Sequence, residues 1–126
     1  MSSNLNRFNA LHEVSYMIKK DIDKCSVMSV SGENQIDLLT RVGTVRYRFF
    51  TNRVIREQNS RVDEYGGTYR TAEFFFQASP VTEGNRVIDE IRIKTQPGQL
   101  IEEFVFFKKY DIASMIQFDT IDRVHE

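Results

Sequence analysis

Apolar side chains in the first 25 residues follow the period of an α-helix. They recur at every third or fourth position, which places them along one face of a helix. The members of this stripe are Leu5, Phe8, Leu11, Val14, Ile18 and Ile22, widened by Ala10, Met17 and Cys25. Ser3 or Asn4 can cap the start, and Lys24 stands in the last turn, where the helix dipole favours a cation. We therefore predict an amphipathic helix over residues 1–25 that packs on a sheet; binding a partner is the alternative use of its apolar face.

From residue 26 to residue 126 the pattern changes to the alternation of apolar and polar side chains that is typical of β-strands. Aromatic and β-branched residues mark the strands, and Gly, Pro, Asn and Ser mark the turns. The predicted strands are 27–30, 53–58, 69–78, 87–95 and 100–110, with a polar loop at 59–68. Residues 112–118 and 121–124 supply one or two further elements of unassigned type. Short turns between successive strands predict mainly antiparallel pairing.

The alternation continues through residues 35–50, but its parity changes at Gly43. A β-bulge or a tight bend at Gly43 explains the change, because one extra residue turns the faces of a strand over. A short helix over residues 34–42 that ends at Gly43 is the alternative. The apolar side chains are even-numbered before the change and odd-numbered after it: Ile36, Leu38 and Val42, then Val45, Tyr47 and Phe49.

The clearest turn in the sequence is Gln96-Pro97-Gly98-Gln99, with Pro and Gly at the second and third positions of a type II turn. A turn centred there pairs Arg92 with Glu103 and Ile91 with Phe104, and gives the hairpin one apolar face and one mixed face. The mixed face is exposed to solvent, covered by the helix or a second copy of the chain, or the wall of a semi-polar cavity. The residues that would line such a cavity are Glu73, Glu90, Arg92, Lys94 and Glu103.

These elements define the expected fold. We predict an α+β fold, with an N-terminal amphipathic helix followed by a predominantly antiparallel, strongly curved β-sheet or small β-barrel. The length of 126 residues is that of one domain, with the helix at 1–25 and the β region at 26–126. A content of 40% hydrophobic and 28% charged residues suits a folded domain with its own core.

Cys25 is the only cysteine, which excludes an intramolecular disulfide and a zinc site built from cysteines. Its place on the apolar stripe of the helix predicts a buried side chain rather than a reactive thiol. Small secreted domains usually depend on several disulfides, so this composition favours the cytoplasm. No stretch reaches the roughly 18 consecutive apolar residues of a membrane span, and we expect no membrane partner.

Charge is distributed unevenly along the chain, although the formal net charge is only −1. Residues 41–70 carry seven arginines and three acids, whereas residues 71–126 carry six basic and ten acidic side chains. Arginine forms bidentate contacts with phosphate and carboxylate groups, which predicts an anion- or partner-binding face. Its candidate residues are Arg41, Arg46, Arg48, Arg53 and Arg56. The alternative is a solvated face whose arginines pair with the acidic C-terminal half.

Residue patterns of the common catalytic sites are not found. The two histidines, His12 and His125, lack a neighbouring nucleophile and lack metal-ligand spacing. The six glycines are scattered and form no phosphate-binding loop. Acids that are neighbours on a strand, such as Asp89 and Glu90, point to opposite faces and cannot act together. We therefore expect no metal and no cofactor, and we favour a non-enzymatic role over an enzyme.

The leading hypothesis is a binding or adaptor domain that engages an acidic protein or a phosphorylated partner through the arginine-rich face. Self-association into an oligomer is also compatible with a basic middle and an acidic end. Nucleic acid is less favoured, because Tyr47 and Phe49 alternate away from Arg46 and Arg48, whereas RNA-binding faces combine aromatic and basic groups. The alternatives are a carrier of an anionic small ligand or a barrel enzyme with a charged internal cavity, and an inhibitor or immunity-type protein.

Overall fold

The computed structural model describes residues 3–67, 69–96, 99–111 and 113–116, and only the backbone of residues 3–11 and 70. One long helix is followed by ten strands. The helix is α1 (Ser3–Lys24), and the first five strands are β1 (Val27–Gly32), β2 (Gln35–Thr40), β3 (Gly43–Phe49), β4 (Arg53–Gln58) and β5 (Arg61–Gly66). The other strands are β6 (Tyr69–Phe76), β7 (Ser79–Pro80), β8 (Arg86–Ile88), β9 (Glu90–Thr95) and β10 (Glu102–Phe107).

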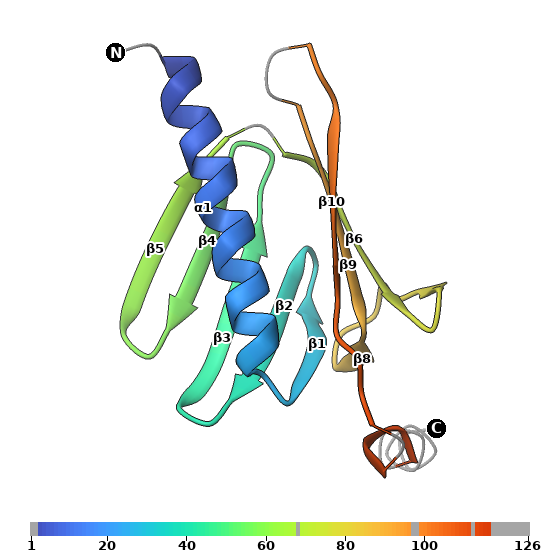
Figure 1. Cartoon of the computed structure of the whole chain (residues 1–126). Helices are drawn as coiled ribbons and strands as arrows, with labels where there is room; N and C mark the ends of the chain where they lie inside the picture. Colours follow the sequence, from blue (N-terminus) through green and yellow to red (C-terminus); the bar gives the residue numbers. More distant parts are fainter. Residues whose placement is uncertain (1–2, 68, 97–98, 112, 117–126) are drawn as a thin grey trace.

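The described strands pair in two antiparallel sheets. The first sheet has the order β5-β4-β3-β2-β1-β8, and the second has the order β10-β9-β6-β7. Strands β1 to β5 are joined by successive short turns, and the chain then crosses to the second sheet at β6. Figure 1 shows α1 lying across one face of the first sheet, with the second sheet beside it.

The two sheets are joined where β8 passes into β9 at Asp89. Strand β8 pairs with β1 in the first sheet, whereas β9 pairs with β6 and β10 in the second. Asp89 holds this corner with its backbone, because its N–H donates to the carbonyl of Phe75 and its carbonyl accepts the N–H of Lys108. One continuous segment of chain therefore serves both sheets.

The hydrophobic core lies between α1 and the inner faces of both sheets. The helix contributes Val14, Ile18 and Ile22, which are buried members of the predicted stripe. Alternate residues of each strand complete the core, as the period of 2 requires. They include Met28, Val30, Ile36, Leu38, Val45, Tyr47, Phe49 and Val54 from the first sheet, and Phe74, Ile88, Ile91 and Ile93 from the segment β6 to β9.

The segment after β10 ties the helix and the first sheet together. The Tyr110 hydroxyl accepts the Met28 N–H at 2.9 Å and donates to the Ile88 carbonyl at 2.6 Å, so it bridges a residue pair of β1 and β8. Burial raises the pKa of Tyr110, which keeps this hydroxyl protonated. The ammonium group of Lys108 donates to the carbonyl of Ile22 at 3.2 Å, near the end of α1.

The helix, the antiparallel strands and the α+β class agree with the sequence-based predictions. Residues 35–40 are a strand and not a helix, and a two-residue turn at Arg41-Val42 joins it to β3. Gly43 has a φ of 121°, a conformation that favours glycine, so the tight bend was the right interpretation of the parity change. Closure into a barrel is not confirmed, because the described strands form two sheets.

Three predictions about the strands were wrong in detail. Residues 59–68 are not one loop: residues 61–66 form β5, an edge strand that alternates between exposed and half-buried side chains and so carries a weak apolar pattern. The predicted strand 87–95 is divided at Asp89. In the last hairpin Arg92 pairs with Val105, not Glu103, a shift of two residues that leaves the side chains of residues 90–95 and 102–107 on their predicted faces.

Other predictions fall partly outside the described residues. The centre of the proposed type II turn, residues 97–98, lies outside them, as does the element proposed at 121–124. Residues 113–116 form one helical turn within the segment left unassigned. No helix in the described part of the chain combines the length and the apolar character needed to cross a membrane.

The thiol of Cys25 is buried, as its place on the stripe predicted, and burial raises its pKa. The thiol of the unfolded chain, with an ordinary pKa of about 8.5, therefore loses its proton first as the pH rises. We expect the free energy of unfolding to fall more steeply between pH 7 and pH 9.5 in the native protein than in Cys25→Ala. Urea unfolding at several pH values measures this difference. Equal pH profiles would show that the thiol ionises alike in the folded and unfolded chains.

Candidate functional site

A buried polar cluster joins α1 to the inner face of the first sheet. Asp21, on α1, accepts two hydrogen bonds from the Arg56 guanidinium, at 2.7 and 3.0 Å. It also accepts the hydroxyl of Tyr47. Tyr47 and Arg56 are cross-strand neighbours on β3 and β4, so the carboxylate of Asp21 meets both side chains from above the sheet. The side chains of Asp21 and Arg56 are only 6% and 7% exposed.

The chemistry of this cluster fixes its charge state. Hydrogen bonding to Asp21 raises the pKa of Arg56 further above its ordinary range, so the guanidinium stays charged. Burial, together with the hydrogen bond that its hydroxyl donates to the Asp21 carboxylate, raises the pKa of Tyr47. Arg56 also donates to the Gln58 side chain at 3.0 Å and lies 3.7 Å from the Asp63 carboxylate. The buried arginine is thus fully engaged with groups of the protein itself.

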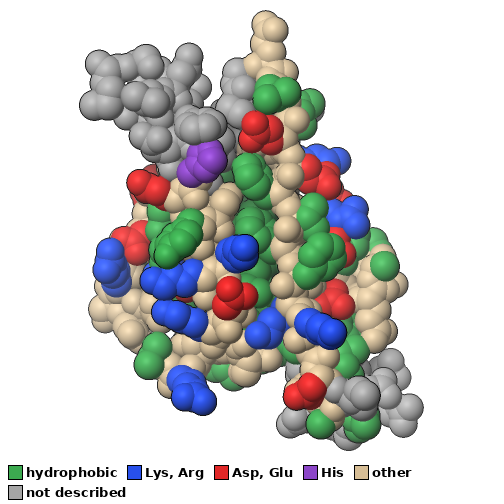
Figure 2. Space-filling view, viewed as in Figure 1, with side chains coloured by type: hydrophobic (Ala, Val, Ile, Leu, Met, Phe, Trp, Pro, Cys, Tyr) green, Lys and Arg blue, Asp and Glu red, His purple; other side chains and the backbone are tan. Residues whose placement is uncertain are grey.

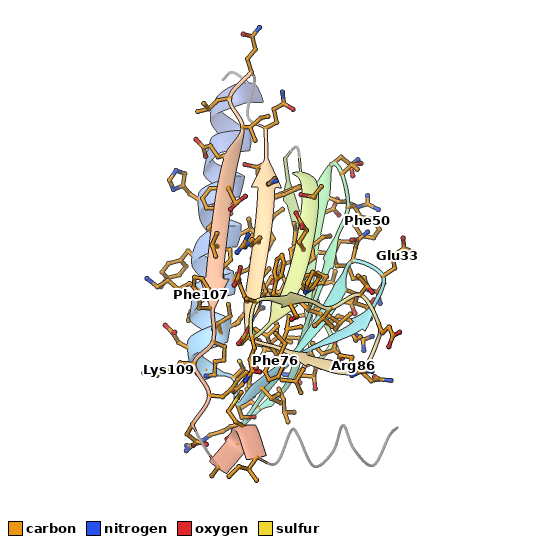
Figure 3. The ribbon with its side chains drawn as sticks, turned by 90° about the vertical axis from the view of Figure 1, so that its right-hand side faces the viewer. Glu33, Phe50, Phe76, Arg86, Phe107 and Lys109 are labelled. Carbon is orange, nitrogen blue, oxygen red and sulfur yellow. The ribbon has the colours of Figure 1, made fainter. Side chains whose placement is uncertain are left out.

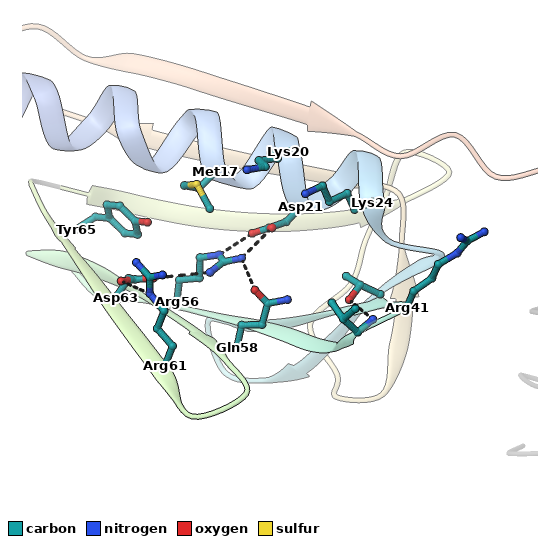
Figure 4. A pocket seen from close by; sticks show the side chains of 12 residues that line it. Met17, Lys20, Asp21, Lys24, Arg41, Arg56, Gln58, Arg61, Asp63 and Tyr65 are labelled. Carbon is teal, nitrogen blue, oxygen red and sulfur yellow. Dashed lines mark hydrogen bonds and ion pairs between the residues drawn. The ribbon is translucent and has the colours of Figure 1, made fainter.

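A groove of about 620 Å³ opens above this cluster, between α1, the turn from β2 to β3, and strands β4 and β5. Its volume lies within the range of small-ligand sites in proteins. Figure 4 shows Tyr65 at one end, Lys24 and Arg41 at the other, and the Asp21–Arg56 pair between them. The lining residues are Met17, Lys20, Asp21, Lys24, Thr40, Arg41, Val42, Arg56, Gln58, Arg61, Asp63 and Tyr65.

The groove carries an excess of positive charge. Its lining includes five cationic side chains and two carboxylates, a formal balance of +3. Arg56 and Arg61 are paired with Asp21 and Asp63. By contrast, no ion pair or side-chain hydrogen bond joins Lys20, Lys24 or Arg41 to another described residue. In Figure 2, Lys and Arg side chains gather over the lower part of the face that contains the groove.

The structure divides the five candidate arginines between two surfaces. Arg41 and Arg56 line the groove, but only Arg41 presents an uncommitted charge. Arg46, Arg48 and Arg53 lie on the opposite face of the first sheet, because side chains alternate along strands. Each is paired with an acid of a neighbouring strand: Arg46 with Asp37 at 2.8 Å, Arg48 with Glu57 at 3.4 Å and Arg53 with Glu64 at 3.6 Å. These acids belong to the first sheet and not to the C-terminal half of the chain.

The structure does not gather the proposed cavity residues around an enclosed space. Glu73, Arg92 and Glu103 are exposed on the outer face of the second sheet. Arg92 pairs with the buried Glu90 and lies over the ring of Phe75 at 4.6 Å, and Lys94 lies 4.0 Å from Glu103. Strand β10, which contains Glu103, ends in Phe107, which is 67% exposed and labelled in Figure 3. This face is a mixture of ion pairs and apolar side chains, most of them at least partly exposed to solvent.

Sequence reasoning missed most of the groove. Asp21 lies three residues after Ile18 and four before Cys25, so a carboxylate interrupts the apolar stripe of the helix. Arg56 shares the parity of the buried Val54 on β4. A charged residue on an apolar face usually has a partner, and this signal could have paired Asp21 with Arg56. The other lining residues come from α1, the β2–β3 turn and β5, which no local pattern brings together.

Metal-ligating side chains are scattered over the described part of the chain. The described residues contain no group of three or more His, Cys, Asp or Glu side chains that could hold a metal ion. His12 is exposed on α1, and His125 lies outside the described residues. In comparisons with known proteins, no family model, no curated protein and no solved structure matches this chain.

We predict that Asp21→Asn lowers the free energy of unfolding by about 3 kcal/mol, because it leaves the buried charge of Arg56 without its main partner. The matched control is Asp37→Asn, which breaks the half-exposed pair with Arg46 and should cost less than about 1 kcal/mol. Urea unfolding of both variants measures the two losses. Equal losses would mean that the buried pair contributes no more to stability than a surface pair.

Proposed function

We propose that this chain is a non-enzymatic binding module that holds an anionic segment of a partner protein, acidic or phosphorylated, in the groove between α1 and the first sheet. The observation that carries the proposal is the set of three cations, Lys20, Lys24 and Arg41, that line the groove without an ion-pair partner among the described residues. Cations without an internal partner are available to an external anion, and charge-assisted hydrogen bonds to such an anion are strong.

The proposal keeps the arginine-rich segment but changes the residues that contact the partner. Arg41 is a direct contact, and Arg56 supports the floor of the groove through Asp21. Arg46, Arg48 and Arg53 are half-buried on the opposite face and already paired with carboxylates. An anion would have to compete with Asp37, Glu57 and Glu64 for them, so the groove is the better binding surface.

The state of the carboxylates in the groove supports binding over catalysis. A general acid or base has to be free to exchange a proton with a bound substrate. Asp21 is held by Arg56 and Tyr47, and Asp63 is held by Arg61 at 3.3 Å and lies near Arg56. Both carboxylates are therefore already engaged by cationic side chains of the protein.

Two variants with the same change in net charge test the proposal. Lys24→Gln/Arg41→Gln removes two groove cations, whereas Arg46→Gln/Arg48→Gln removes two cations from the opposite face. Fluorescence anisotropy at low salt would measure binding of a labelled heptaglutamate and of a labelled heptapeptide with one phosphoserine. We expect the groove variant to weaken binding of whichever peptide binds by tenfold or more, about 1.4 kcal/mol. The control variant should change binding less than twofold.

Repeating the titration at several salt concentrations gives a second test of the proposal. Binding by exposed cations should weaken as the ionic strength rises, because salt shortens the range of the interaction. An equal loss of affinity in the two variants would move the site away from the groove. Undetectable binding of both peptides to the native protein would refute the proposal.

A further inference from the structure

We infer that the anion bound in the groove is a phosphate monoester on a protein segment, rather than the carboxylate of an acidic one. This inference rests on the proposed function and adds the chemical class of the ligand. It is carried by the arrangement of the uncommitted cations together with the shape of the groove they line.

The two lysines that the helix presents to the groove suit a doubly charged group. Lys20 and Lys24 are separated by one helical turn, so their side chains share a face of α1. Arg41, in the turn between β2 and β3, lines the same groove, and Figure 4 shows its side chain extending away from Lys24. A phosphate monoester carries a charge of about −1.5 to −2 at pH 7 and three acceptor oxygens. A single carboxylate carries one charge, and would leave one of the two lysines without a counter-charge.

The surroundings of these cations do not cancel their charge. The hydroxyl of Thr40 donates to the carbonyl of Gly43 at 2.6 Å, so it is already hydrogen-bonded within the protein. The carbonyl of Ile22, near the negative end of the helix dipole, accepts the ammonium group of Lys108. Both carboxylates of the lining are held by arginines further along the groove. An incoming anion therefore meets lysines that no carboxylate of the lining neutralises.

The rest of the groove favours a phosphate that is part of a chain over a free phosphate ion. Beyond the cations the lining continues to Met17 and Tyr65, so an apolar side chain next to the phosphorylated residue has a place to pack. Figure 4 shows that this half of the groove lies past the Asp21–Arg56 pair, away from Lys24 and Arg41. A groove of about 620 Å³ also exceeds what a single phosphate needs. We therefore name a phosphorylated segment of a partner protein as the occupant.

Four probes distinguish this inference from the proposed function. They are heptapeptides of leucine with a central phosphoserine, glutamate or serine, and inorganic phosphate as a competitor. Fluorescence anisotropy on the full chain measures the affinities, and chemical-shift changes of backbone amides at 20–24 and 40–42 locate the site. We expect the phosphoserine peptide to bind at least tenfold tighter than the glutamate peptide. The variant Lys24→Gln/Arg41→Gln should abolish most of that difference without changing the thermal unfolding temperature.

Three other outcomes would each reject a different part of the inference. Equal binding of the phosphoserine and glutamate peptides in the groove would reject the phosphate preference and leave the proposed function intact. Competition by inorganic phosphate at the affinity of the phosphopeptide would reject a protein segment as the occupant and indicate a small-anion site. Failure of every probe to shift amides of the groove would reject the proposed function as well.

Discussion

The ion pair between Asp21 and Arg56 is the constraint on which the arrangement of helix and sheet depends. Removing two charges from water costs several kcal/mol per ion, and only good geometry with further hydrogen bonds offsets that cost. Here the guanidinium donates two hydrogen bonds to the carboxylate, Tyr47 donates a third, and Gln58 accepts one from the arginine. The apolar stripe alone would tolerate sliding or rotation of α1 on the sheet. The Asp21 carboxylate has to reach both Tyr47 and Arg56, and this requirement fixes the position of α1 on the sheet. The position of α1 in turn determines where Lys20 and Lys24 lie.

The register of the first sheet explains why some arginines are free and others are not. On its outer face each arginine finds an acid on a neighbouring strand, and Arg46 is flanked in register by Asp37 on one side and Glu57 on the other. Arg41 sits in a turn and has no strand on either side to supply an acid. Lys20 and Lys24 project from a helix across a groove, away from the ladder. Uncommitted charge therefore collects where the regular pairing of strands ends.

The predictable part of the structure was the part encoded by local patterns. The period of 3.6 residues located α1, and the period of 2 located most strands. The period of 2 also assigned side chains to the correct faces of the last hairpin, although the predicted register there was wrong by two residues: Arg92 pairs with Val105. Edge strand β5 was missed because only one of its faces touches the core, through Tyr65. The groove was missed because it combines residues 17–24, 40–42 and 56–65, and the helix position that unites them is fixed by one buried ion pair. The interrupted stripe at Asp21 and the parity of Arg56 indicate that each needs a buried partner, but local periodicity does not identify that partner.

The same ion pair separates the residues that stabilise the fold from the residues of the proposed binding site. Because Asp21 and Arg56 neutralise each other, the floor of the groove contributes little net charge, and the field that an anion meets comes from side chains at the rim. Those side chains are exposed, make no ion pair with another described residue, and therefore contribute little to folding. If the groove binds an anion as proposed, substitutions at the rim would alter which anion binds without loosening the helix, whereas substitutions in the floor would act first on the position of the helix. The fold thus places its stabilising charges and its uncommitted charges on adjacent but independent residues of one helix, Asp21 and its neighbour Lys20.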